Sequence, residues 1–199
     1  MSGDFDASYT AYQTDRSALR RIVRRMYLRS AAAQLRGPTV DFGCGVGELL
    51  DRLPAGSKGL EYNLATVTHC RAKGLDVEAY DGYADDWNLS ALAGGRFESM
   101  VISHVLEHLD EPTQILGKLL TAAEGLGIGR VLVIVPGQAG YRIDATHRTF
   151  VDRPMLSADG VVAGTGFELA RSRYFPGDLR KIGDWFPHHE LQALFLAQR

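Results

Sequence analysis

Three glycines at alternate positions, in the string VDFGCGVGELL from Val40 to Leu50, restrict the fold more than any other feature of the chain. The apolar residues before them predict a short buried strand, and the residues after them predict a helix. Gly43, Gly45 and Gly47 lack a Cβ atom, so the backbone can turn sharply and let a ligand approach closely. A connecting turn would need one glycine rather than three. We therefore predict that this loop binds a ligand, helped by the unpaired N–H groups of a helix start.

Short apolar runs alternate with amphipathic stretches along the chain, which is typical of βα units that form a mostly parallel sheet. The run VLVIV within Arg130–Pro136 is the strongest strand signal. We expect strands at 39–42, 59–62, 77–80, 97–103, 130–136, 167–174 and 190–197. Helices are expected at 15–34, from the glycine loop to 53, at 64–73 and 112–124, and after a cap at Asp152. The segment 84–93 is expected to form a helix or an irregular segment. The pattern predicts an α/β fold with a Rossmann-like, doubly wound, mostly parallel seven-stranded sheet and an antiparallel last strand.

The composition is that of an ordinary globular protein and argues against several classes. The formal net charge of −2 gives the whole chain no bias toward nucleic acid. The two cysteines form no CxxC pair, and no cluster of acids and histidines has metal-ligand spacing, so we expect no metal. No apolar run approaches the ~20 residues of a membrane span. We expect a cytoplasmic protein with a helical N-terminal segment or lid at 1–36 and one domain at 37–199.

The nearest alternative for the glycine loop is the dinucleotide-binding loop of nicotinamide dehydrogenases. That loop has the spacing GxGxxG, in which the third glycine allows close packing of the helix. Here the spacing is GxGxG, and Glu48 takes the sixth position. Asp41 stands just before the first glycine, where its carboxylate would repel a pyrophosphate and attract a cation. The loop therefore favours a ligand with a positive centre and an ammonium group.

The string DFGCGVG at Asp41–Gly47 resembles motif I of the class I S-adenosylmethionine-dependent methyltransferases, and the likeness runs from about Thr39 to Pro136. The other strings that carry it are GLEYN (59–63), YDGYADDW (80–87) and FESMVISHVLEHLDEP (97–112). The last of these is similar to the small-molecule, methyltransferase-11-like subgroup. The resemblance implies S-adenosylmethionine as the cofactor.

The resemblance also implies where the cofactor binds, at the carboxyl ends of consecutive strands. Glu61 would hold both ribose hydroxyls, Asp81 would meet the adenine amino group, and the end of the fourth strand would line the methionine end. The expected cofactor residues are Asp41, Gly43, Cys44, Gly45, Gly47, Glu61, Tyr62, Asn63, Asp81, Gly82, Ser103, His104 and Val105. Each acid alone is more often a surface or turn residue. Three acids at consecutive strand ends together indicate one site.

Within that family, the segment from KGLEYN to GLDV (58–77), together with the GELL that follows the glycines, is most similar to the methionine-biosynthesis MetW proteins. Two functions stay open. One is methyl transfer from S-adenosylmethionine to a small-molecule acceptor. The other is a cofactor-binding partner or regulatory protein without its own methyl transfer, because MetW proteins are associated with a partner acyltransferase. The subgroup likeness fades after Pro136, so it does not identify the acceptor.

A general base would assist methyl transfer to oxygen or nitrogen, and histidine titrates in a suitable range. His147 is the first catalytic candidate, because it follows the fifth strand on the expected cofactor side, and Asp144 could orient it. The alternative is a structural histidine that caps the next helix. His108 is the second candidate, and its alternative is a motif residue packed near the adenosyl group.

The first helix has an apolar seam and a basic outer surface that carries Arg16, Arg20, Arg21, Arg24, Arg25 and Arg29. Such a surface would suit an acidic acceptor, although a solvated face paired with acids is commoner. The arginines are not interleaved with the series of aromatic residues that a nucleic-acid stacking platform requires, so we expect no nucleic-acid partner. A homodimer stays open.

Tyr9 and Tyr12 could close the site as part of a lid. Tyr174, Trp185 and Phe186 would shape an acceptor pocket, unless they are core residues.

Overall fold

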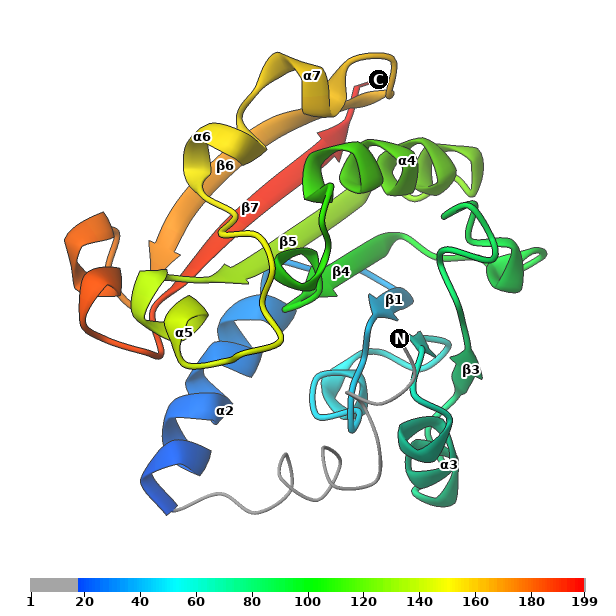
Figure 1. Cartoon of the computed structure of the whole chain (residues 1–199). Coiled ribbons are helices and arrows are strands. Elements are labelled where there is room, and N and C mark those ends of the chain that lie inside the picture. Colours follow the sequence, from blue (N-terminus) through cyan, green and yellow to red (C-terminus); the bar gives the residue numbers. More distant parts are fainter. Residues whose placement is uncertain (1–17, 199) are drawn as a thin grey trace.

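The computed structural model describes residues 18–198, and it describes side chains from residue 23 onward. Tyr9 and Tyr12, which were expected in a lid, lie outside the described residues, so the lid stays a prediction. One twisted sheet runs through the molecule, with helices against both of its faces (Figure 1). Within residues 18–198 no helix combines the length and the apolar character that crossing a membrane requires.

The sheet has seven strands in the order β3-β2-β1-β4-β5-β7-β6. The strands are β1 (Thr39–Phe42), β2 (Lys58–Glu61), β3 (Val77–Ala79), β4 (Ser99–Ser103), β5 (Arg130–Pro136), β6 (Phe167–Phe175) and β7 (Glu190–Ala197). The first five strands are parallel to one another. The strand β7 is antiparallel to both β5 and β6. This confirms the predicted mixed seven-stranded sheet with an antiparallel last strand.

Alternation along the strands builds a core on each face of the sheet, because successive side chains point to opposite faces. On β5, Val131 and Val133 join the larger core that holds the apolar side of α4. Leu132, between them, joins a second core with Leu28 of α2. The helices are α2 (Ala18–Ala32), α3 (Leu64–Ala72), α4 (Pro112–Gly125), α5 (Gln138–Arg142), α6 (Arg153–Leu156) and α7 (Asp159–Val162). Burial on both faces explains why β5 is a continuous apolar run.

The helix predicted after the glycine loop is wrong, and the segment 84–93 is irregular. After the glycine loop the chain forms only a 3₁₀ turn, η1 (Leu50–Arg52), because Pro54 forces Leu53 into an extended conformation. In the segment 84–93, Trp87 and Leu89 have positive φ values of 62° and 56°, which a right-handed helix does not accommodate. Only the 3₁₀ turn η2 (Ser90–Leu92) forms there. The predicted cap at Asp152 is confirmed, since its side chain accepts the N–H of Met155.

Candidate functional site

The glycine loop leaves β1 through three left-handed residues. Gly43, Gly45 and Gly47 have φ values of +69°, +52° and +77°. A Cβ atom on Gly43 would lie 2.4 Å from Cγ2 of Val105, so the close approach of the next loop also requires glycine. The N–H of Gly43 donates to the carbonyl of Leu60 at 2.8 Å, which fixes the loop against the end of β2. The backbone conformation therefore depends on the glycines that the sequence singled out.

Glu61, the last residue of β2, ties the glycine loop to the start of α3. Its Oε2 atom accepts the N–H of Gly45 at 2.9 Å, and its Oε1 atom accepts the N–H of Asn63 at 2.8 Å. Burial raises the pKa of Glu61, although these backbone N–H groups act in the opposite direction. Asn63 caps α3 by accepting the N–H of Ala65. Tyr62, between Glu61 and Asn63, is 53% exposed. Glu61 thus stands at the junction of the loop and the open edge of the sheet.

Asp41 is a nearly buried acid, 2% exposed, on β1 just before the first glycine. Burial raises the pKa of Asp41 to about 7; Arg24 lowers it and the Glu61 carboxylate raises it further. Its Oδ2 atom has no hydrogen-bond partner among the described residues. A buried carboxylate oxygen without a partner is costly, so a cation nearby would stabilise its ionised form. By contrast, the side chain of Cys44 packs with Val67 and other apolar residues.

The end of β3 places Asp81 and Gly82 near the same edge. Asp81 is exposed, and its Oδ1 atom accepts the N–H of Tyr83 at 3.0 Å, so it also forms the turn that its sequence suggests. A Cβ atom on Gly82 would lie 2.4 Å from the ring of Trp87. Trp87 is buried against Phe42. Trp87 is therefore a core residue that supports the turn.

At the end of β4, Ser103 and Val105 flank His104, which adopts a positive φ of 57°. The Nδ1 atom of His104 lies 3.1 Å from Oε1 of Glu107, and its Nε2 atom lies 3.1 Å from Oε1 of Glu190. Burial lowers the pKa of His104, but the two carboxylates outweigh it and raise the pKa to about 9. At neutral pH His104 is therefore a cation between two acids. Sequence reasoning missed both partners; the one signal was a glutamate at the start of the mostly apolar strand β7.

The two catalytic candidates, His108 and His147, meet in space. Their ring centroids lie 4.8 Å apart. The Nδ1 atom of His147 lies 2.8 Å from the carbonyl oxygen of Tyr141, whose ring stacks on the imidazole. The predicted orienting residue Asp144 binds Thr146 through Oδ1, and its Oδ2 atom lies 3.9 Å from Nε2 of His147. The next helix is capped by Asp152, so the alternative role of His147 as its cap is wrong.

A family model described as "Methionine biosynthesis protein MetW" matches residues 31–143, more than half of the chain. The chain belongs to the MetW family. This confirms the resemblance found in the sequence. A comparison with curated protein sequences gives no match for this MetW-family protein.

Solved structures similar to this MetW-family protein are S-adenosylmethionine-dependent methyltransferases. One, from Archaeoglobus fulgidus, has a TM-score of 0.70 at 19% identity and covers 96% of this chain and 100% of its own. Another is the magnesium protoporphyrin IX methyltransferase ChlM from Synechocystis PCC 6803 with bound SAH, with a TM-score of 0.64 at 14% identity over 92% and 89% of the two chains. A second structure of ChlM, with bound SAM, is also similar to this chain. These likenesses show that the MetW-family protein has the class I methyltransferase fold.

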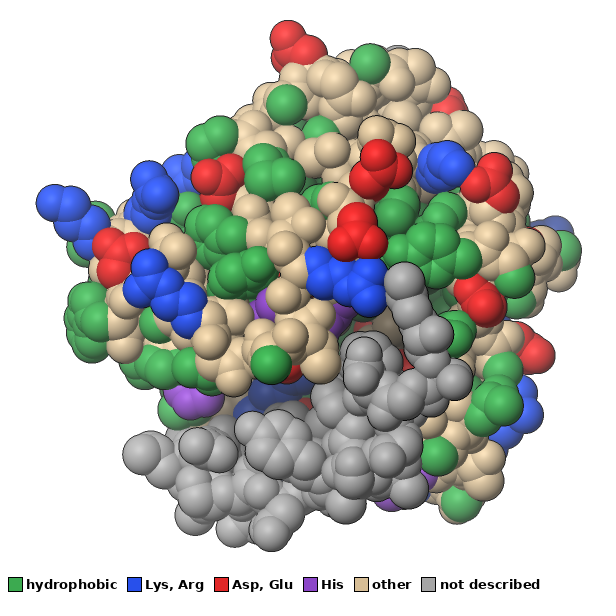
Figure 2. Space-filling view, in the orientation of Figure 1, with side chains coloured by type: hydrophobic (Ala, Val, Ile, Leu, Met, Phe, Trp, Pro, Cys, Tyr) green, Lys and Arg blue, Asp and Glu red, His purple; other side chains and the backbone are tan. Residues whose placement is uncertain are grey.

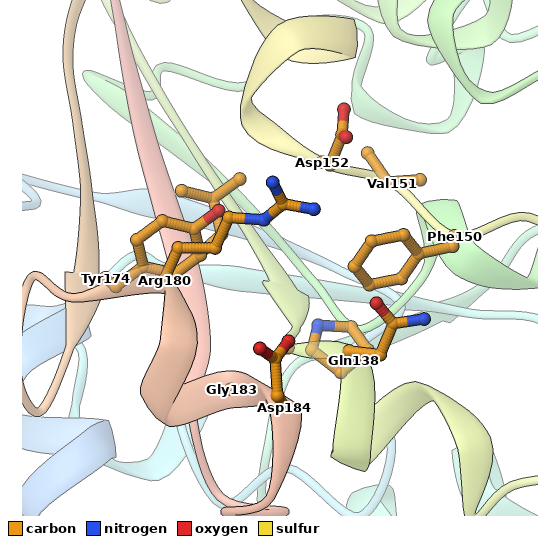
Figure 3. Close-up of a pocket in the computed structure, with 11 residues that line it drawn as sticks. Gln138, Phe150, Val151, Asp152, Tyr174, Arg180, Gly183 and Asp184 are labelled. Carbon is orange, nitrogen blue, oxygen red and sulfur yellow. The ribbon is translucent and has the colours of Figure 1, made fainter.

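Two cavities flank the site of the MetW-family protein. Figure 3 shows the first, at the end of β5, where Tyr174, Arg180 and Phe150 surround a space of about 10 Å³. That volume holds about one water molecule. The second, about 410 Å³, lies between α2 and the glycine loop and is lined by Arg24, Arg25, Arg52 and Lys73 together with acids. Of the predicted acceptor aromatics, Tyr174 thus lines a cavity, whereas Trp185 is 72% exposed.

Proposed function

We propose that this protein binds S-adenosylmethionine along the carboxyl ends of β1 to β4 and transfers its methyl group to a small-molecule acceptor. The observation that carries the proposal is the carboxylate of Glu61, held by Gly45 at the mouth of the glycine loop. Open α/β sheets bind ligands at this edge. The predicted cofactor residues come to that edge from four strand ends, as the family resemblance implies.

The residues present fit this cofactor. The unpartnered Oδ2 atom of Asp41 would be stabilised by the positive charges of the amino acid end. Glu61 would accept hydrogen bonds from the ribose, Tyr62 is exposed beside it, and Asp81 is exposed at the next strand end. When bound, the cofactor would supply an electrophilic methyl group, so the main task of the chain is to align the acceptor with it.

The charges on the protein surface indicate which class of acceptor the protein would bind. Figure 2 shows basic, acidic and apolar side chains interspersed over the described part of one face, rather than one extended basic patch. A small molecule is therefore favoured over nucleic acid. The basic side chains that line the cavity beside α2 favour an acidic acceptor. His108 and His147, which follow β4 and β5, are proposed as the residues that would accept a proton from the acceptor.

A second candidate function is a cofactor-binding partner protein that transfers no methyl group. Family membership supports it, and so do three exposed apolar side chains. Ile143 follows α5, Leu179 precedes the 3₁₀ turn η4 (Arg180–Asp184), and Trp185 follows that turn. They are 73%, 67% and 72% exposed, and α5 packs against η4. Exposed apolar groups of this kind often mark protein–protein contacts.

Calorimetric titration of the full-length protein tests cofactor binding. We expect S-adenosylmethionine and S-adenosylhomocysteine to bind with micromolar-range affinity (about −8 kcal/mol), whereas NADH does not bind. Transfer of labelled methyl to a panel of small acidic acceptors would then separate the enzyme from the partner protein. Binding of NADH in place of S-adenosylmethionine would contradict the proposal.

We expect cofactor affinity to rise with pH, because Asp41 must lose its proton to attract a cation. The pKa of Asp41 is raised to about 7. Below that pH the carboxyl is neutral, so binding would release a proton and weaken by up to about 10-fold per pH unit. Titrations from about pH 6 to about pH 8, in buffers of different ionisation enthalpy, measure both effects. The variant Asp41→Asn should bind more weakly and lose this pH dependence; an unchanged slope would exclude Asp41 as its source.

The same raised pKa predicts how stability without cofactor depends on pH. The folded protein holds the Asp41 proton up to about pH 7, whereas the unfolded chain loses it near the ordinary value of about 4. The contribution of Asp41 to the free energy of unfolding therefore falls as pH rises across this window. Urea unfolding of the wild type and of Asp41→Asn from about pH 4 to about pH 7 measures how the free energy of unfolding of each depends on pH.

A further inference from the structure

Three potential metal ligands, Glu107, His108 and His147, meet beside His104, although His147 is 39 positions from His108 in the sequence. Glu107 and His108 belong to the 3₁₀ turn η3 (Leu106–His108) after β4, and His147 lies in the loop after α5. Each offers one ligand atom, and these atoms all lie within 4.8 Å of one another. No other group of this kind occurs among the residues that the structure describes.

Both imidazoles are oriented as metal-binding histidines usually are. A histidine ligand commonly donates its second ring N–H to a carbonyl or carboxylate, which fixes the ring and leaves the other nitrogen for the metal. The Nδ1 atom of His147 is 2.8 Å from the carbonyl oxygen of Tyr141. The Nδ1 atom of His108 is 3.3 Å from the carbonyl oxygen of Thr146. In each ring, Nε2 is therefore the nitrogen that would bind a metal ion.

Glu107 supplies the negative charge and an oxygen that needs a partner. Its side chain is fully buried, and His104 holds its Oε1 atom at 3.1 Å. Its Oε2 atom is buried with no hydrogen-bond partner among the described residues. An unpaired carboxylate oxygen in a buried site is costly, and a bound cation would remove that cost.

We propose that Glu107, His108 and His147 bind a divalent first-row transition-metal ion. Two imidazole nitrogens and one carboxylate oxygen suit Zn²⁺, Fe²⁺, Co²⁺ or Mn²⁺, whereas Ca²⁺ and Mg²⁺ prefer oxygen ligands alone. Ligand atoms about 2.1 Å from a common ion lie roughly 3 to 3.5 Å apart. The three side chains would therefore close by about 1 Å around the ion, a rotation of χ angles. The Oδ2 atom of Asp144, 3.9 Å from Nε2 of His147, is a fourth ligand atom within reach.

The spacing of these ligands in the sequence is the reason that the sequence predicted no metal. His108 and His147 are 39 positions apart, and Glu107 and His108 are adjacent, which is not a familiar ligand spacing. Parallel strands bring the loops after β4 and β5 to the same edge of the sheet. If the proposed function holds, an open coordination position would bind an oxygen atom of the acceptor; that consequence rests on methyl transfer, whereas metal binding does not.

Titration of metal-free, full-length protein with Co²⁺ tests the site, because nitrogen and oxygen ligands give Co²⁺ visible absorption bands. We expect one equivalent to bind, and Zn²⁺ to displace it. The variants His147→Gln and His108→Gln should each weaken Co²⁺ binding by about 100-fold. The matched control is His188→Gln, at an exposed histidine outside the cluster, which should bind as wild type does.

Circular dichroism of each variant establishes that it is folded, and the two single variants test the same ion independently. Absence of Co²⁺ bands in the folded wild-type protein would overturn the proposal. So would equal Co²⁺ affinity in wild type and in a folded His147→Gln or His108→Gln variant. Titration with S-adenosylmethionine in the metal-free protein is a separate measurement, so a failure of the proposed function remains distinguishable from a failure of the metal site.

Discussion

Replacing Glu61 with alanine is expected to weaken S-adenosylmethionine binding by about 100-fold or more. Hydrogen bonds to a charged group contribute about 1.5–3 kcal/mol each, and two ribose hydroxyls would lose their acceptor together. Each 1.4 kcal/mol corresponds to about a factor of ten in affinity. Calorimetric titration of the wild type and the variant under one buffer condition measures the change.

Two further variants separate the charge of Glu61 from its structural role, because its carboxylate also accepts the N–H of Gly45. Glu61→Gln keeps the size and one acceptor oxygen, and it should still lose at least about 10-fold in affinity. Glu78→Ala is the matched control, an acid on the neighbouring strand that contacts Lys58 at the surface. If Glu61→Gln bound the cofactor as tightly as wild type, the assigned ribose contact would be wrong.

Replacing Gly43 with alanine is expected to lower the free energy of unfolding by about 2–5 kcal/mol. A left-handed conformation costs an alanine about 1–2 kcal/mol, and overpacking adds about 1–3 kcal/mol. Both apply here, since Gly43 has a φ of +69° and its new Cβ atom would lie 2.4 Å from Cγ2 of Val105. Urea unfolding followed by circular dichroism measures the loss.

Gly74 offers a matched control for the conformational part of this loss. Its φ is +79°, but a Cβ atom there would meet nothing within 4 Å. Gly74→Ala should therefore show the left-handed cost alone, about 1–2 kcal/mol. Equal losses in the two variants would mean that the loop after β4 moves away from Gly43 without cost, and that the close approach of Val105 does not constrain the site.

Local patterns in the sequence were sufficient where neighbouring residues decide the structure. The strands predicted at Arg130–Pro136, from its apolar run, and at Glu190–Ala197 have the bounds that the structure shows. The predicted helices after the glycine loop and at 84–93 failed for local reasons too. Pro54 ends the first, and left-handed residues interrupt the second. The prediction of two helices there followed the general alternation of strands and helices.

The candidate cofactor site could be predicted as a set of residues but not as a set of contacts. The glycines, Asp41, Glu61 and Asp81 stand at strand ends that the sequence locates. That Glu61 binds the N–H of Gly45, and that Asp41 is buried with one oxygen unpaired, depend on packing between strands. Burial is a property of the whole fold, and it decides the pKa of Asp41.

By itself, the sequence determined where the strands lie along the chain, the sharp turn of the glycine loop and the family resemblance, because the spacing of apolar residues and glycines acts over a few positions. Only the tertiary structure decided which charged groups share a site. His104 pairs with Glu190, 86 positions away, and His147 comes to Glu107 across the β4–β5 edge. The physical reason is that parallel strands gather the ends of distant segments at one edge, where burial and charge act on them together.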